Sequence, residues 1–414
     1  MKDTYIQGSE LWDKLKEFPS DIPPAIVFNA HITGLAIARS LGKEGIPVIA
    51  LDRDGRAVGL QSKYVGAGIL CPNPLTDEEG FISLLLEIGK RLPLKGVLFP
   101  CNDEWVLTVS RHREKLQQYY HFPFADYDIV EPLLNKHKLY KKAEELGIPH
   151  PKTWYPGEWE SPEALSKAVP YPCIIKPVEQ RSFYEAFQKK AILIENPQEF
   201  QRALSEVSGH GTVVQEIVGS SLSDFYSLCT YVDPDGEVKG YFTGRKLEQY
   251  PQNFGTGCLV ESSPIDEFVP AGTEILQTAG YYGISETEFV YDSRDQTYKL
   301  LDVNTRVWKW IGLPVFAGVN LPLLAYSAAA GRSIEKMEAE RDYAKWVYVQ
   351  DYLQLKQEKG TSGYGHLTDE ELLSVVTGQL PSENLADAVI DADDPLPSVR
   401  QVKNQYQNGY ICPC

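Results

Sequence analysis

The stretch Ser285-Glu-Thr-Glu-Phe-Val-Tyr-Asp-Ser-Arg-Asp-Gln-Thr-Tyr-Lys-Leu-Leu-Asp-Val-Asn-Thr-Arg306 contains two runs of alternating residues joined by a polar turn. This alternation predicts a β-hairpin. A five-residue turn over 293–297 sets Glu288 directly opposite Asp302 and Asn304 opposite Glu286. Because side chains alternate across a strand, one face of the second strand is expected to carry Leu300, Asp302, Asn304 and Arg306.

Glu288 and Asp302 face each other in this register, with Cβ atoms about 5 Å apart. Two like charges at this distance destabilise the pair unless a cation lies between them. Magnesium is the natural candidate, because it binds one or two carboxylates and completes its shell with nucleotide phosphates and water. Asn304 would add a neutral oxygen. The alternative is a solvated hairpin whose acidic residues face water.

The composition is that of a globular protein with several packed units. The chain has 414 residues, of which 43% are apolar, and this length predicts two or three units. No apolar run is long enough to span a membrane, and the N-terminus lacks the order of a signal peptide, so a cytoplasmic location is expected. The seven cysteines are scattered and are expected to be reduced, although the closing Cys412-Pro-Cys414 leaves metal binding or oxidation open.

The net charge of -17 argues against nucleic acid or an anionic membrane as a partner. An anionic substrate therefore needs a local basic pocket. Lys176 is the better candidate for such a pocket, because it ends the apolar strand 173–176 and a buried ammonium without a partner is costly. Lys136 is the second candidate. It could equally be an ordinary lysine on the solvent-exposed face of a helix.

The N-terminal part predicts a parallel sheet. A strand over 25–29, a helix over 33–44 and a strand over 47–52 form a βαβ unit, and a further helix over 81–91 precedes a strand over 96–100. A charged helix is expected over 131–146, and Gly147 ends it. The middle portion, 172–304, predicts an α+β arrangement.

Two turns in the N-terminal part raise the question of ligand binding. The first βαβ turn has a single glycine, Gly34, which disfavours a dinucleotide even though Asp52 lies where a ribose-binding acid would. A small anion at this helix N-terminus is the more plausible ligand. The segment 102–104 follows the strand over 96–100, at the end of the sheet where open α/β sheets bind ligands, so it is a candidate ligand-binding segment. Helix capping by Asn102 or Asp103 explains these residues equally well.

Five segments, taken in order, resemble the ATP-grasp superfamily across roughly residues 25 to 330. They are Asn135-Lys136 with Gly147-Ile-Pro-His-Pro151, Ile174-Ile-Lys-Pro177, Val214-Gln-Glu-Ile-Val-Gly219, Thr287-Glu-Phe289 and Leu300-Leu-Asp-Val-Asn-Thr-Arg306. The resemblance implies that Lys136 and Lys176 contact ATP phosphates and that Glu216, Ile217 and Val218 form the adenine hinge. It also implies that Glu288, Asp302 and Asn304 hold magnesium, with manganese as a substitute, and that Arg306 steadies an acyl phosphate.

The same resemblance divides the chain into an N-terminal parallel-sheet domain, a two-lobed ATP-grasp fold and an extension, a mixture of α/β and α+β classes. The expected bounds are a leader helix over 1–21, the N-terminal domain over 22–125, a small lobe over 126–210, a large lobe over 211–330 and a C-terminal extension over 331–414.

Two features depart from the usual pattern. The loop over 178–190 lacks the glycines with which many ATP-grasp enzymes close over the phosphates, although Lys190 is expected to reach the nucleotide. Asp302 and Thr305 stand where Glu and Pro are commoner. Glycine-poor loops of this kind occur in the D-aspartate ligase-like, carboxylate–amine branch, which the chain resembles most.

Further residues are expected near the substrates. Asp224 is placed to take ribose hydroxyls, and Arg245 or Lys246 to neutralise the acyl phosphate and a substrate carboxylate. Trp308 and Trp310 either line a substrate wall or pack in the core.

The expected function is an ATP-dependent ligase that forms an amide between a small carboxylate and a small amine through an acyl phosphate. The alternatives are a ligase with a non-amine acceptor, an ATP-binding regulatory module without catalysis, and an oxidoreductase that uses a dinucleotide. A homodimer is also left open.

Overall fold

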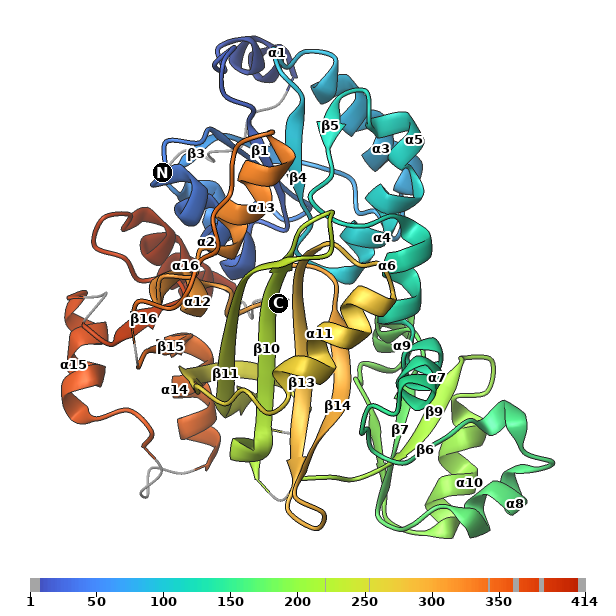
Figure 1. Ribbon diagram of the computed structural model, residues 1–414. Helices are drawn as coiled ribbons and strands as arrows, with labels where there is room; N and C mark the ends of the chain where they lie inside the picture. The colour runs from blue at the N-terminus through green and yellow to red at the C-terminus, as the bar shows by residue number, and fades with distance from the viewer. Residues whose placement is uncertain are drawn as a thin grey trace.

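The computed structural model describes residues 8–219, 221–252, 254–341, 343–359, 365–379 and 383–408. Three β-sheets organise this part of the chain (Figure 1). None of its helices combines the length and the apolarity that crossing a bilayer requires.

The N-terminal domain is a five-stranded parallel sheet with the order β3-β2-β1-β4-β5. Helices precede and connect its strands because the apolar runs are interrupted by amphipathic segments with their own caps, such as Asp77 at the start of α3. The elements are α1 (Gly8–Lys16), β1 (Ala25–Phe28), α2 (Ile32–Gly42), β2 (Val48–Asp52), η1 (Val58–Gln61), β3 (Val65–Leu70), α3 (Glu78–Gly89), β4 (Gly96–Phe99), α4 (Asp103–Arg111), α5 (Arg113–Leu116) and β5 (Tyr120–His121).

The small lobe follows, with a four-stranded antiparallel sheet of order β6-β9-β7-β8. Its own hydrophobic cluster includes Trp154, Phe183 and Phe200. The elements from the N-terminal domain onward are α6 (Tyr127–Leu134), α7 (Lys136–Leu146), β6 (Thr153–Trp154), η2 (Pro156–Glu158), α8 (Pro162–Ala168), β7 (Cys173–Pro177), α9 (Gln180–Phe187), β8 (Ile192–Ile194), α10 (Pro197–Glu206) and β9 (Thr212–Glu216).

The large lobe is built on a seven-stranded sheet with the order β14-β13-β10-β11-β12-β15-β16. Neighbouring strands are antiparallel except β15 and β16. The elements are η3 (Leu222–Asp224), β10 (Phe225–Val232), β11 (Val238–Tyr250), β12 (Thr256–Ser262), α11 (Val269–Thr278), β13 (Gly283–Asp292), β14 (Thr297–Asn304), α12 (Gly312–Phe316) and α13 (Leu321–Ala329).

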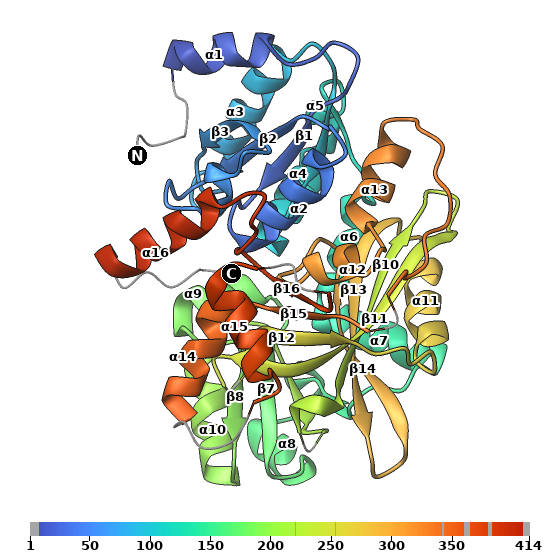
Figure 2. The same ribbon diagram turned by 90° about the vertical axis from the view of Figure 1, so that its left-hand side faces the viewer.

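The C-terminal region completes the large sheet and then returns to the N-terminal domain. Its elements are β15 (Lys345–Val347), α14 (Val349–Lys359), α15 (Asp369–Thr377), β16 (Leu385–Asp387) and α16 (Leu396–Asn408). Figure 2 shows α16 against the N-terminal domain, while α14 and α15 flank the far edge of the large sheet. Arg400 of α16 donates to the carbonyl of Gly55, and Asn404 donates to that of Arg56.

The structure corrects three expected boundaries. The helix expected over 131–146 is two helices, because Asn135 leaves the helical conformation and its side chain caps α7 by accepting from the Lys138 amide. β9 pairs with β6 and β7, so the small lobe extends to Glu216 and past the expected boundary at 210. The large lobe does not end at 330, because β15 and β16 of the expected extension continue its sheet.

Hydrophobic packing joins the N-terminal domain to the large lobe. One cluster contains Ile26 and Phe28 of β1 together with Leu228 and Phe289 of the large sheet. A second places Leu35 of α2 with residues of the large lobe and C-terminal region. The small lobe, with its separate cluster, is attached to this larger body.

Candidate active site

The β13–β14 hairpin has the expected register at its functional end. Glu288 pairs with Asp302, and Glu286 pairs with Asn304. The turn is one residue shorter than expected, because β14 already begins at Thr297, and a bulge after Glu288 restores the register. One expectation is therefore wrong: Leu300 lies opposite Phe289 and packs in the core with it, instead of sharing the face of Asp302.

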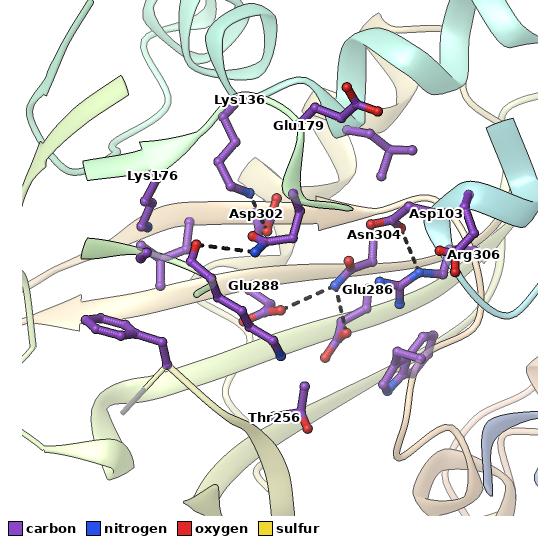
Figure 3. A pocket seen from close by; sticks show the side chains of 18 of the residues that line it. Asp103, Lys136, Lys176, Glu179, Thr256, Glu286, Glu288, Asp302, Asn304 and Arg306 are labelled. Atoms are coloured by element: carbon purple, nitrogen blue, oxygen red, sulfur yellow. Dashed lines mark hydrogen bonds and ion pairs between the residues drawn. The ribbon is translucent and has the colours of Figure 1, made fainter. Parts of the chain in front are cut away.

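Three acidic or amide side chains of this hairpin are joined by hydrogen bonds (Figure 3). The Asn304 amide donates to Glu286 Oε2 at 3.0 Å and to Glu288 Oε1 at 3.3 Å. Ser227 Oγ donates to the other oxygen of Glu286 at 3.0 Å. Burial, together with the like charge of Glu288, raises the pKa of Glu286 well above its usual range. A cation at this place would relieve the repulsion between the two carboxylates.

These donors fit a magnesium ion. Glu288 and Asp302 offer hard carboxylate oxygens, and Asn304 keeps its carbonyl oxygen for a ligand because its NH₂ group already donates to the two glutamates. In the described parts of the chain no three acidic, histidine or cysteine side chains lie close enough to hold an ion alone. An ion here would therefore depend on phosphate and water oxygens as well, which is usual for magnesium.

Lys136 reaches the hairpin from the first turn of α7. Its ammonium lies 2.6 Å from Asp302 Oδ2, and the residue is only 6% exposed, so it is not an ordinary helix-face lysine. Burial by itself lowers the pKa of Lys136, but the charge of Asp302 outweighs this effect and the net pKa rises to about 12. Lys136 is therefore a permanent cation beside the candidate metal site.

Lys176 lies at the end of β7, as expected. Its ammonium donates to Gln215 Oε1 at 2.7 Å, and Gln215 in turn donates to Thr153 Oγ1 at 3.0 Å. Burial and the nearby charge of Lys136 lower the pKa of Lys176 to about 8. A neutral amide partner does not compensate the charge of Lys176, so an anionic ligand would stabilise it.

The segment after β7 is a helix, α9, and not the expected loop. Phe183 is fully buried in the small lobe and contacts Phe187, one turn later, with ring centroids 4.6 Å apart. The glycines at this side of the cavity come instead from another loop, through Gly209 and Gly211. Sequence reasoning missed this loop, although its glycines flank His210 and precede a strand.

Lys190 follows α9 and borders the cavity. Burial, with repulsion from Lys309 and Lys246, lowers the pKa of Lys190 to about 8. Its ammonium makes no hydrogen bond or ion pair with any side chain that the structure describes. Lys190 therefore belongs to a second group of cations, apart from Lys136 and Lys176.

Lys246 and Arg245 project from opposite faces of β11. Lys246 borders the cavity, with its ammonium 3.9 Å from Glu288 Oε2. Arg245 makes two hydrogen bonds to Glu261 on the other face, at 2.9 and 2.5 Å. The structure brings Lys246 to the site and leaves Arg245 outside it.

Arg306 meets the N-terminal domain at the cavity. Its Nε donates to Asp103 Oδ1 at 2.8 Å, across the boundary between the large lobe and α4 (Figure 3). Asn102 occupies the N-cap position of α4, but its side chain does not cap the helix and accepts instead from Asn29 at 3.0 Å. The segment 102–104 thus contributes Asp103 and Glu104 to the cavity wall.

The expected adenine hinge and ribose acid are not among the residues that line the cavity. The Glu216 carboxylate accepts from the Lys152 amide at 2.9 Å and pairs with Arg294 at 3.0 Å. Ile217 and Val218 follow the end of β9, and the Asp224 carboxylate accepts from the Ser221 amide in a capping box. This end of the cavity is lined instead by Lys176, Ser221, Leu222, Phe225 and Leu301.

The cavity has a volume of about 1140 Å³ and lies where the three units meet. Trp308 and Trp310 satisfy both earlier interpretations, because they are 2% and 5% exposed in the core and also border the cavity. Sequence reasoning missed Lys309, Thr256 and Lys359, which line the same end. Lys309 stands between two noted tryptophans, but nothing in the pattern indicated the direction of its side chain.

The first βαβ turn lies outside the cavity lining. Gly34 is required there, because a Cβ atom would lie 2.5 Å from the carbonyl oxygen of Asn29. Asp52 is buried beside His31, with 3.8 Å between His31 Nε2 and Asp52 Oδ2, so it does not act as a ribose ligand of this site.

No protein-family model matches the sequence. The chain is 28% identical to D-aspartate ligase from Enterococcus faecium over 257 residues, which cover 58% of this chain and 61% of that protein. The chain therefore spans less than two thirds of this relative.

Two solved structures share the fold. N5-carboxyaminoimidazole synthetase from Staphylococcus aureus, complexed with ADP, aligns with a TM-score of 0.63 and 16% identity over 83% of this chain and 88% of that one. L-amino acid ligase from Bacillus licheniformis aligns with a TM-score of 0.61 and 16% identity over 79% and 80%.

Proposed function

Because the chain has the ATP-grasp fold, which confirms the resemblance seen in its sequence, we propose that it is an ATP-dependent carboxylate–amine ligase. The reaction joins a carboxylate to an amine through an acyl phosphate and releases ADP and phosphate. The observation that carries the proposal is the convergence of Lys136, Lys176 and the Glu288–Asp302 pair on one cavity that Arg306 also borders.

The phosphate-binding part of the reaction falls to the two lysines. Lys176 lacks an acidic partner and gains one when a phosphate arrives, whereas Lys136 already pairs with Asp302 and holds it in place. Asp302, Glu288 and Asn304 supply the oxygens for magnesium, which neutralises phosphate charge when it is bound. Preorganised positive charge is the main requirement of phosphoryl transfer.

The proposed reaction has two steps. A carboxylate oxygen of the acid attacks the γ-phosphorus of ATP, the bond to the β–γ bridging oxygen breaks, and ADP leaves. The amine nitrogen then attacks the acyl carbon, the bond from that carbon to the phosphate oxygen breaks, and the nitrogen loses a proton. Arg306 and Lys246 border this part of the cavity, where they stabilise the negative charge of the acyl phosphate.

The names of two relatives, D-aspartate ligase and L-amino acid ligase, support an amino acid as one of the two substrates. An amino acid offers both of the reacting functional groups, and ligands of this size fit beside ATP in a cavity of about 1140 Å³. Magnesium and ATP are the proposed cofactor and co-substrate, which agrees with the ADP named in the structure from Staphylococcus aureus.

The acyl phosphate can be tested with an acid whose carboxylate oxygens are labelled with oxygen-18. The labelled acid is incubated with the protein, magnesium-ATP and an amine pool, and phosphate is analysed by mass spectrometry. The proposal predicts one labelled oxygen in the released phosphate, because that oxygen leaves with phosphorus. Unlabelled phosphate would contradict the acyl phosphate, AMP with pyrophosphate would indicate adenylation, and saturable ATP binding without turnover would favour a regulatory module.

A further inference from the structure

Beyond the reacting groups, we propose that the end of the cavity beside Trp308 and Trp310 binds a second anionic group of the acid substrate, and that Lys309 selects for it. The inference rests on the proposed function and names the substrate class: acids that carry a carboxylate in addition to the one that is activated. The observations concern Lys309, its partners in the C-terminal region and the balance of charge around it.

Lys309 is held in position from two sides. Its ammonium lies 2.5 Å from Asp351 Oδ2 of α14 and donates to Thr256 Oγ1 of β12 at 3.2 Å. The residue is 9% exposed and borders the cavity. Because an ammonium has three N–H donors and these partners take two, one donor remains for a ligand.

Three of the four lysines at this end have a carboxylate within 4 Å. Lys309 pairs with Asp351, Lys359 with Glu248 at 2.9 Å, and Lys246 lies 3.9 Å from Glu288. Lys190 has no such partner among the described side chains, and the charges of Lys309 and Lys246 act on it. An ion bound to Glu288 would also take that carboxylate from Lys246. Within the described residues, Lys190 and Lys246 would then both lack a carboxylate partner, and an anion bound at this end would compensate their positive charge.

These cations are separate from those assigned to ATP. Lys136 and Lys176 reach the cavity from α7 and β7 of the small lobe, and the charge of Lys136 acts on Lys176. In the sequence, Lys309 comes after β14, which carries the candidate metal ligands, and after Arg306. Its ammonium is held by Asp351 of α14. We therefore assign the anion that Lys309 holds to the acid substrate. The alternative is that Lys309 holds a phosphate of ATP, and the experiment below separates the two by comparing the KM for the acid with the KM for ATP.

The C-terminal region is part of this end of the cavity. Helix α14 supplies Asp351, which holds Lys309, and Lys359, which lines the wall. Its Tyr352 and Leu355 are 1% exposed and pack in a cluster with Leu247 and Leu259 of the large sheet. The expected extension thus acts as a fixed wall for the acid substrate.

The test uses the full-length protein and three four-carbon acids. Aspartate has two carboxylates, whereas 2-aminobutyrate and 3-aminobutyrate each replace one of them with a methyl group. Acid-dependent ADP formation is measured for the parent, for Lys309→Met and for Lys345→Met. The last variant is a matched control, because Lys345 is 8% exposed and pairs with Glu371 in the same region but does not line the cavity.

We expect the parent to prefer aspartate over both monocarboxylates. Lys309→Met should raise the KM for aspartate by about tenfold to a hundredfold, the effect of losing one charged hydrogen bond, with the KM for ATP unchanged. Lys345→Met should change neither constant. A parent without preference, a rise in the KM for ATP, or an equal loss for all three acids would overturn the inference.

A double variant and a binding measurement are added to the kinetic test. Lys309→Met leaves Asp351 buried without its partner, so the double variant Lys309→Met with Asp351→Leu removes both charges together and preserves the fold. Should the parent form no ADP with any acid and amine, the proposed function fails separately. Aspartate binding is then measured by calorimetry with magnesium and a non-hydrolysable ATP analogue, and absence of binding, or equal binding by parent and double variant, contradicts the inference.

Discussion

The ammonium groups of Lys176 and Lys190 are poised to lose their protons near neutrality. Burial is the largest cause at both residues, and neighbouring lysines add to it, so both pKa values lie at about 8. Each lysine binds phosphate or carboxylate oxygens only in its protonated form. Anion binding is therefore strong below pH 8 and declines as the pH rises through that value.

We predict that the Kd for ATP rises above pH 8, by up to about tenfold per pH unit, because Lys176 must regain a proton before it can bind a phosphate. Calorimetric titration between pH 6.5 and 9.5 measures the change. Lys176→Arg should make the rise shallower, because a guanidinium stays charged over this range. A Kd for ATP that does not depend on pH would show that Lys176 does not contact the phosphates.

Asp103 orients Arg306 from the neighbouring domain, and the two side chains are 28% and 17% exposed. We predict that Asp103→Asn lowers kcat by about tenfold to a hundredfold, the usual effect of disturbing a group that stabilises the transition state, with the KM for ATP unchanged. Steady-state kinetics measures the effect. The control is Asp126→Asn, which removes the charge of an exposed acid paired with Arg113 outside the cavity lining. Equal kinetics for the two variants would contradict this role.

At this scale the sequence predicted residues whose direction follows from a simple period. Glu288, Asp302 and Asn304 follow from strand alternation, and Lys176 follows from its place at the end of an apolar strand. Arg245 and Lys246 are adjacent, so the sequence could not decide which of them faces the cavity. The direction of Lys309 depends on Asp351, which is 42 residues away in the chain.

Among the elements, the β13–β14 hairpin shows how an expectation can be right at one end and wrong at the other. The short turn and the bulge cancel each other at Asp302, whereas Leu300 lies on the opposite face. The unpaired residue of the bulge is Leu301, next to Leu300, and two adjacent leucines do not show in the sequence which of them is buried. The helix expected over 131–146 failed for a related reason, because Asn135 is compatible with a helix interior and with a cap.

Helix α9 stands where a glycine-poor loop was expected, and Phe183 anchors it in the small-lobe core. We predict that Phe183→Ala destabilises the small lobe by about 3–5 kcal/mol, the usual cost of such a cavity. Hydrogen exchange followed by mass spectrometry should show faster exchange in β7, β8 and β9. ATP binding should weaken, because Lys176 and Lys190 flank this helix.

Tyr184→Ala is the matched control, since the neighbouring Tyr184 is 37% exposed. It should leave both exchange and ATP binding unchanged. Equal effects of the two variants, or faster exchange throughout the N-terminal domain, would contradict an independent small-lobe core.

In the whole molecule, the C-terminal region ties the large lobe to the N-terminal domain through Asp394. This residue is 1% exposed and accepts from Arg39 Nε at 3.0 Å, Ser62 Oγ at 2.6 Å and the Lys63 amide at 2.9 Å. We predict that Asp394→Ala destabilises this contact by about 3 kcal/mol, because it removes the nearest carboxylate from the buried Arg39 and leaves only Asp391, at 4.0 Å, as an acidic partner among the described residues. Urea unfolding and limited proteolysis near α16 measure the effect.

The neighbouring Asp393 pairs with Lys63 and Tyr64 on the surface. Asp393→Ala should therefore leave the urea midpoint and the proteolysis pattern close to those of the parent. Comparable losses in the two variants would show that Asp394 has no special role in joining the domains.

The sequence predicted the succession of units well but not the way in which they are joined. Strand and helix patterns are local, so the N-terminal parallel sheet and the α+β middle portion could be recognised from them, whereas the division into two lobes came from the family resemblance. The addition of β15 and β16 to the large sheet, and the return of α16 to the N-terminal domain, depend on contacts between distant residues, such as Leu259 with Val347 and Gly55 with Arg400. The sequence left the role of residues 331–414 open between a lid, an interface and a substrate collar, and Lys359 of this segment lines the cavity wall.

The central claim is that Asp302 belongs to a metal–nucleotide site that drives ligation. The most direct measurement incubates the protein with magnesium-ATP and pooled carboxylates and amines and follows ADP, AMP and phosphate by mass spectrometry. Asp302→Asn is compared with the parent and with Asp295→Asn, a variant of the same hairpin in which an exposed acid beside Lys299 loses its charge. We predict ADP and phosphate from the parent and from Asp295→Asn, and none from Asp302→Asn. Full ATP-dependent activity in Asp302→Asn would contradict the account.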